Sequence, residues 1–124
     1  MNFNTQRPIY RQIADYCFAR ILSGDWRPGE KVASVRELAL QMTVNTHTVL
    51  KAFEYLQNHQ VIEPRRGMGY YLAEDAPKRV RATLREEFFE TTMPEFFEQM
   101  RLLGIEIDDI VKAWHEKFAR GNSA

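Results

Sequence analysis

The sequence predicts a mainly α-helical protein with one small β-hairpin. Three observations lead to this fold class. Apolar residues recur every three to four positions in several stretches of the 124-residue chain, which is the period of an amphipathic helix. Serine, asparagine, proline and glycine residues stand where such helices begin and end. One stretch, residues 61–73, has instead the residue types of a strand, a tight turn and a second strand.

Composition restricts the function classes only in part. Seventeen basic residues balance seventeen acidic ones, so any attraction to nucleic acid or to a membrane must come from a local patch. The single cysteine, Cys17, excludes an internal disulfide and fits a reducing cytosol. We expect neither a signal peptide nor a membrane-spanning helix, and we predict a cytoplasmic protein.

The first helix is expected from about Pro8 to Leu22. Gly24 should end it in a left-handed conformation, and Pro28-Gly29 should form a turn soon after. One face carries apolar residues at intervals of four: Ile9, Ile13, Cys17 and Ile21.

Two further helices follow with a very short connection. Ser34 and Glu37 fit a capping box, which predicts a helix over residues 35–41. Asn45 suits the N-cap of the next helix. Two helices joined by so few residues are typical of a helix-turn-helix. Thr43 occupies the position where many such turns carry glycine.

The outward face of the third helix, expected to end near residue 59, begins with Thr46, His47 and Thr48 and continues to Lys51. Short hydrogen-bond donors at a helix N-terminus, followed by a cation one turn later, suit contact with phosphates and base edges. Solvated polar surface is the alternative interpretation, and for His47 both stay open.

The next stretch predicts the wing of a winged helix, because a hairpin comes directly after the helix-turn-helix. Arg65, Arg66 and Gly67 lie at its tip, where arginines can meet phosphates or enter a minor groove. Arginine pairs elsewhere are usually solvated surface charge. Tyr70 and Tyr71 are expected to pack the wing against the core rather than to stack on bases.

A domain boundary is expected after residue 75. It separates a winged helix-turn-helix DNA-binding domain, residues 1–75, from a helical dimerisation region, residues 76–124. Pro94 should kink or split the first helix of that region, and Gly104 should end it. The region carries five phenylalanines and a tryptophan, more than about fifty residues can bury alone, so a partner subunit should cover them. A ligand cage around Trp114 is the alternative.

Little in the sequence suggests an enzyme or a metal site. There is no phosphate loop and no nucleophile motif. No pair among His47, His59, His115 and Cys17 has the spacing of metal ligands, so we expect neither a metal nor a cofactor. A winged helix used only for protein–protein contact is a third function class. It predicts a neutral wing and recognition face, whereas basic residues occur at both.

Three motifs together resemble the signature of the GntR family of bacterial transcription regulators. They are GEKVASVRELA at residues 29–39, VNTHTVLKAFEYL at residues 44–56 and RRGMG at residues 65–69. The similarity runs over residues 7–73 without a gap. The short helical tail resembles the YtrA subfamily, whose C-terminal part dimerises and whose members often regulate transport operons. The chain is too short for the aminotransferase-like branch.

The resemblance implies a sequence-specific transcriptional regulator, a repressor, that binds a pseudo-palindromic operator in double-stranded DNA as a homodimer. The residues that it places at the DNA are Arg36, Thr46, His47, Thr48 and Gly67, with Lys51 at a phosphate. Arg65 and Arg66 join them through their position on the wing.

Two departures limit what the resemblance can transfer. Ala33 stands where the family commonly has proline. Thr46 and Leu50 stand where several branches have arginines, the first of which reads guanine, so operators of those branches should not be assumed here. The sequence specifies neither the operator, nor an effector, nor the regulated genes.

Overall fold

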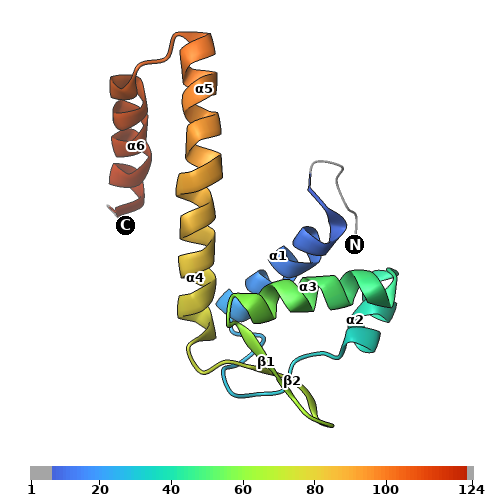
Figure 1. Ribbon diagram of the computed structural model, residues 1–124. Coiled ribbons are helices and arrows are strands. Elements are labelled where there is room, and N and C mark those ends of the chain that lie inside the picture. Colours follow the sequence, from blue (N-terminus) through green and yellow to red (C-terminus); the bar gives the residue numbers. More distant parts are fainter. Residues whose placement is uncertain (1–6, 123–124) are drawn as a thin grey trace. The chain divides into compact units, whose positions relative to one another are not determined.

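The computed structural model describes residues 7–122, with side chains up to residue 119. The chain divides into two compact units, of which the first ends at Leu84 and the second begins at Arg85. The expected fold class, mainly helical with one small hairpin, is confirmed (Figure 1). No helix in the described part is long and apolar enough to cross a bilayer. The elements are α1 (Ile9–Leu22), α2 (Val35–Met42), α3 (Thr46–Asn58), β1 (Ile62–Arg65), β2 (Gly69–Leu72), α4 (Ala76–Glu87), the π-helical segment η1 (Phe88–Thr92), α5 (Met93–Leu103) and α6 (Ile107–Asn122).

Three helices, α1 to α3, build the core of the N-terminal unit. Each turns one apolar face inward, and these faces meet in a single hydrophobic cluster. Because the inward residues of α3 are spaced at i, i+3, i+4 and i+7, the opposite face of that helix is left to solvent. The inward residues, all fully buried, are Val49, Ala52, Phe53 and Leu56.

The connection between α2 and α3 is held by the expected caps. Glu37 N donates to Ser34 Oγ at 3.0 Å and Ser34 N donates to Glu37 Oε1 at 3.4 Å, which completes the capping box. His47 N donates to Asn45 Oδ1 at 2.8 Å at the start of α3. Thr43 has φ 56° and ψ 52°, a left-handed conformation that favours glycine, so this threonine takes the role that glycine has in many such turns.

The hairpin is antiparallel and is anchored to the helical core. Arg65 lies opposite Gly69 at the end of the ladder nearest the tip. The other edge of β2 meets the segment before α2, where Val32 N donates to Tyr70 O at 3.0 Å. The Tyr70 ring packs edge-on against the Phe53 ring of α3, with ring centres 5.0 Å apart. The prediction that Tyr70 packs the wing against the core is thereby confirmed.

Most of α4, up to Leu84, belongs to the N-terminal unit. Ala76 and Val80 are fully buried in the same cluster as α1 and α3. Thr83 Oγ1 lies 3.4 Å from Nδ1 of His59, the residue that caps the end of α3. The compact unit therefore reaches Leu84 and extends past residue 75, where the sequence suggested the winged domain to end.

Helix α5 follows α4 through a π-helical segment rather than through a loop. Pro94 lies in the first turn of α5, directly after η1. Proline lacks an N–H and cannot continue the regular helical bonding pattern, and a wider π-helical turn accommodates the missing donor. The expected split at Pro94 therefore occurs with the chain still helical on both sides. Gly104, with φ 68°, ends α5 as expected.

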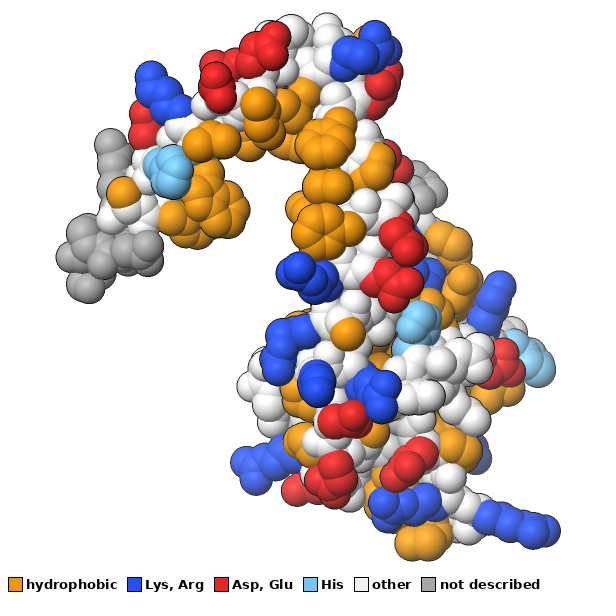
Figure 2. All heavy atoms as spheres, turned by 60° about the vertical axis from the view of Figure 1, so that its left-hand side comes forward, with side chains coloured by type: hydrophobic (Ala, Val, Ile, Leu, Met, Phe, Trp, Pro, Cys, Tyr) orange, Lys and Arg blue, Asp and Glu red, His pale blue; other side chains and the backbone are white. Residues whose placement is uncertain are grey.

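Most apolar side chains of the C-terminal unit are exposed. Among its described residues only Met100 is buried. Figure 2 shows the apolar side chains gathered along η1, α5 and α6, on the sides of these helices that face one another. A face of this kind fits a surface that another polypeptide covers. Its exposed members are Phe88, Phe89, Phe96, Phe97, Leu102, Leu103, Ile107, Val111, Trp114 and Phe118.

Candidate nucleic-acid interface

The first turn of α3 is open to solvent. Thr46 and His47 are exposed and Thr48 is half-buried. Asn45 caps the helix through one amide only, and the N-terminus keeps the partial positive charge of a helix end. Donor side chains are thus presented at a positively polarised helix end, an arrangement that suits phosphate oxygens and base edges.

Lys51 lies on the same side of α3, and its side chain contacts the neighbouring helix α1. Its Nζ atom lies 4.4 Å from the centre of the Tyr10 ring of α1. The face of an aromatic ring attracts a cation, so Tyr10 holds the ammonium group close to the exposed turn of α3. The two helices border an open groove beside the recognition face, lined by Pro8, Ile9, Tyr10, His47, Thr48 and Lys51.

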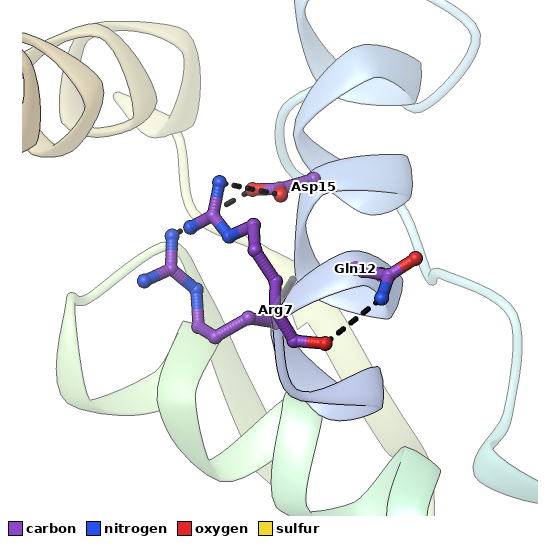
Figure 3. Close-up of polar contacts among 4 residues, drawn as sticks. Arg7, Gln12 and Asp15 are labelled. Carbon is purple, nitrogen blue, oxygen red and sulfur yellow. Dashed lines mark hydrogen bonds and ion pairs between the residues drawn. The ribbon is translucent and has the colours of Figure 1, made fainter. Parts of the chain in front are cut away.

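Polar contacts fix the beginning of α1 beside α3. Arg7 Nη1 lies 3.1 Å from Asp15 Oδ2, and Gln12 Nε2 donates to the carbonyl oxygen of Arg7 at 2.9 Å (Figure 3). Arg11 also pairs with Asp15, at 3.6 Å, and its guanidinium lies 4.3 Å from the centre of the Tyr55 ring of α3. The position of Tyr10 next to Lys51 is therefore set by contacts on both sides of it.

The wing presents two arginines in different ways. Arg65 is anchored, because its guanidinium carbon lies 3.9 Å from the centre of the Tyr71 ring and its Nη2 is 3.5 Å from Glu63 Oε1. Arg66 is exposed at the turn and forms no ion pair with another described residue. Gly67 follows with φ 73°, and a side chain there would meet nothing within 4 Å. The tip of the hairpin projects free of the helices (Figure 1).

Arg36 is exposed in the first turn of α2 and, like Arg66, pairs with no described acid. Four of the predicted residues thus lie together on α3: Thr46, His47, Thr48 and Lys51. The structure places Arg36 on the preceding helix, and Arg65, Arg66 and Gly67 on the hairpin.

Two neighbours of the predicted residues were not singled out from the sequence. Tyr10 lies on α1, and the spacing within one helix carries no signal for its contact with Lys51. Lys31 is the other. Its side chain lies against Gly69, such that a Cβ on Gly69 would come within 2.9 Å of Lys31 Cε. A bridge between Lys31 and Tyr71 places this cation beside the wing.

Neither a reactive cysteine nor a metal-binding cluster is found among the described residues. Burial raises the pKa of the Cys17 thiol to about 12, so the sulfur stays protonated and is a poor nucleophile. No group of three or more histidine, cysteine, aspartate or glutamate residues in the described part is arranged to hold a metal ion.

Comparison with known families agrees with this geometry. The family model described as bacterial regulatory proteins, gntR family, matches residues 9–72. The chain belongs to the GntR family. The match runs from α1 to β2 and so includes both helices of the helix-turn-helix and the wing. The resemblance drawn from the three sequence motifs is confirmed.

Relatives of this chain occur in Bacillus subtilis. The HTH-type transcriptional regulator YhcF is 33% identical over 110 residues, which is 89% of this chain and 89% of YhcF. The HTH-type transcriptional repressor YtrA is 44% identical over 69 residues, 56% of this chain and 53% of YtrA. These similarities support the YtrA-like subfamily and a regulator rather than an enzyme.

Solved structures are similar to this chain as well. A GntR family transcriptional regulator from Listeria monocytogenes superposes with a TM-score of 0.72 at 36% identity, covering 93% of this chain and 98% of that one. The DNA-binding domain of AraR in complex with the operator ORX1 has a TM-score of 0.55 at 25% identity, covering 59% of this chain and 93% of that domain. This GntR protein therefore has the DNA-binding winged helix of its family, followed by a helical region.

Proposed function

We propose that this GntR protein is a homodimeric repressor that binds a pseudo-palindromic operator. In each protomer α3 enters a major groove and the wing follows the adjacent minor groove. Two half-sites about one helical turn apart then match the two-fold symmetry of the dimer. The observation that carries the proposal is the open first turn of α3, where Thr46 and His47 are exposed.

Each side chain of the interface has a role that follows from its chemistry. Thr46, His47 and Thr48 contribute base discrimination, and each well-formed base contact is worth about 1–3 kcal/mol. Lys51, held beside the α3 face by the Tyr10 ring, binds a phosphate. The remaining members bind phosphates or the minor groove and supply affinity that falls with salt: Arg36, Arg65, Arg66 and the backbone at Gly67.

A second copy of the chain is the partner that we propose for the apolar face of η1, α5 and α6. Helix α6 has no buried residue among its described side chains, and a sixteen-residue helix is marginal in water without tertiary packing. A two-fold axis brings the same face of a second chain against it and covers the aromatic side chains of both copies. The aromatic character of this face also fits the core of an interface.

The regulated genes are inferred from the subfamily. The YtrA-like resemblance supports control of a transport operon, and the repressor name of YtrA supports a negative sign of regulation. The proposal places the protein in the cytoplasm, together with the bacterial chromosome.

The test begins with selection of bound sequences from random DNA by the purified full chain. Fluorescence anisotropy then measures the affinity for the selected operator as salt is raised. If Arg36, Arg65 and Arg66 each bind one phosphate in both protomers, their joint replacement by alanine lowers the salt slope by about 5. A control variant loses three cations outside the proposed interface: Arg81, Arg101 and Lys112, each replaced by alanine.

Equal affinity and equal salt slope in the wild type and the triple arginine variant would contradict the assignment of these residues. Failure of the wild-type protein to select any sequence would instead favour the second candidate, a winged helix that contacts only proteins. The exposed basic residues at α2 and at the wing argue against that candidate, because they leave positive charge where a protein-only surface has no use for it.

A further inference from the structure

Leu50 is an apolar side chain on the solvent side of α3. It is 38% exposed and belongs neither to the hydrophobic cluster nor to the partly buried residues packed against it. It lies four residues after Thr46 and three after His47, so these three side chains form one patch on the first two turns of the helix. Packing in the hydrophobic cluster does not account for a leucine at this position.

Apart from Lys51, the same two turns lack the side chains that read purines through paired hydrogen bonds. Arginine or lysine reads guanine in this way and asparagine or glutamine reads adenine, and Lys51 is the one such residue between residues 46 and 51. Lys51 is drawn toward Tyr10 on one flank of the helix. What remains for the bases is the single ring of His47, the hydroxyls and methyls of Thr46 and Thr48, and the two methyls of Leu50.

The apolar part of this set has one matching partner in the major groove. Thymine alone among the four bases presents a methyl group there, and apolar side chains contact it. We propose that Leu50, with the Thr46 methyl beside it, is a specificity-determining residue that reads thymine methyl groups. Each half-site of the operator then carries thymine at the position that faces the second turn of α3. This inference rests on the proposed function and adds the base that the recognition helix prefers.

Deoxyuridine provides a direct test, because it removes the thymine methyl and keeps the base pair. Each thymine of the selected operator half-site is replaced by deoxyuridine in turn, and affinity is measured by anisotropy for the full-length dimer. Burial of one methyl-sized group corresponds to about a fourfold change in affinity. The wild type should therefore bind about fourfold more weakly at the position that Leu50 contacts. The Leu50→Ala variant should lose most of this difference between the thymine and deoxyuridine operators.

A matched control is Leu22→Ala. Leu22 is another exposed leucine of the same unit, 43% exposed, at the end of α1 and outside the recognition helix. This variant should keep the full deoxyuridine penalty. Thermal unfolding of Leu50→Ala verifies that its fold is intact, while the deoxyuridine series on wild-type protein needs no variant at all.

The outcomes separate the inference from the function on which it rests. Specific binding with no deoxyuridine effect at any thymine would overturn the role of Leu50 and leave the operator-binding function standing. The same would follow if Leu50→Ala lost as much affinity as the wild type on the deoxyuridine operator. Absence of any selected sequence would overturn the proposed function, and the thymine contact with it.

Discussion

Replacement of Trp114 by alanine is expected to dissociate the proposed homodimer. Trp114 lies on α6, with its ring centre 4.5 Å from that of Phe118. An indole side chain of about 200 Å² that is 61% exposed leaves about 120 Å² for a partner to cover. At about 25 cal/mol per Å² this area corresponds to about 3 kcal/mol in each protomer, and to about 6 kcal/mol in a symmetric pair.

Such a loss raises the dissociation constant of the dimer by up to about ten-thousandfold. Sedimentation equilibrium over a series of protein concentrations measures this constant directly. Glu116→Ala is the control, because Glu116 is exposed on the same helix but two residues away, on a different face. A Trp114→Ala protein that sediments like the wild type at every concentration would refute the proposed interface. Equal dissociation by Glu116→Ala would refute the assignment to this face.

Three further predictions concern single residues of the N-terminal unit. Arg66→Ala should weaken binding to all DNA sequences alike and lower the salt slope of the dimer by about 2, measured by anisotropy; loss of binding to the operator alone would contradict a phosphate contact. Ser34→Ala should lower the free energy of unfolding in urea by about 1 kcal/mol, whereas Ser34→Thr should retain most of it. The ordinary pKa of a cysteine thiol, 9.0, applies to Cys17 in the unfolded chain, and burial in the folded protein raises it to about 12. The unfolded chain therefore loses this proton first as pH rises, so stability should fall between pH 9 and pH 12 by about 1.4 kcal/mol per pH unit. The Cys17→Ala variant should therefore lose less unfolding free energy than the wild type over this pH range, as measured by urea unfolding at each pH. Identical pH profiles for the two proteins would contradict the buried, protonated thiol.

Local signals in the sequence were sufficient for the order and type of the elements. The caps at Ser34 and Asn45 form within three residues along the chain, and the left-handed end at Gly104 depends on one residue. The apolar spacing of α3 likewise decides which face is buried, because the period of a helix is independent of its surroundings. These features could be predicted since the interacting groups are close in sequence.

Contacts between distant segments could not be predicted in the same way. The Lys51 ammonium group meets the Tyr10 ring only because α1 and α3 pack side by side, forty-one positions apart in the sequence. Thr43 has no intrinsic reason to be left-handed, and the short connection from α2 to α3 imposes that conformation. Pro94 predicted a kink or a split, but no signal in the sequence indicated the π-helical segment that precedes it.

By itself, the sequence determined the winged helix-turn-helix, the solvent-facing side of its third helix and the residue types exposed there. It did so because caps, helical periodicity and turn residues act over a few neighbouring positions. Only the tertiary structure decided that the core takes in the first half of α4, that Tyr10 guides Lys51 and that Tyr71 anchors Arg65. These depend on side chains that meet across the fold, and their partners are chosen by packing rather than by spacing along the chain.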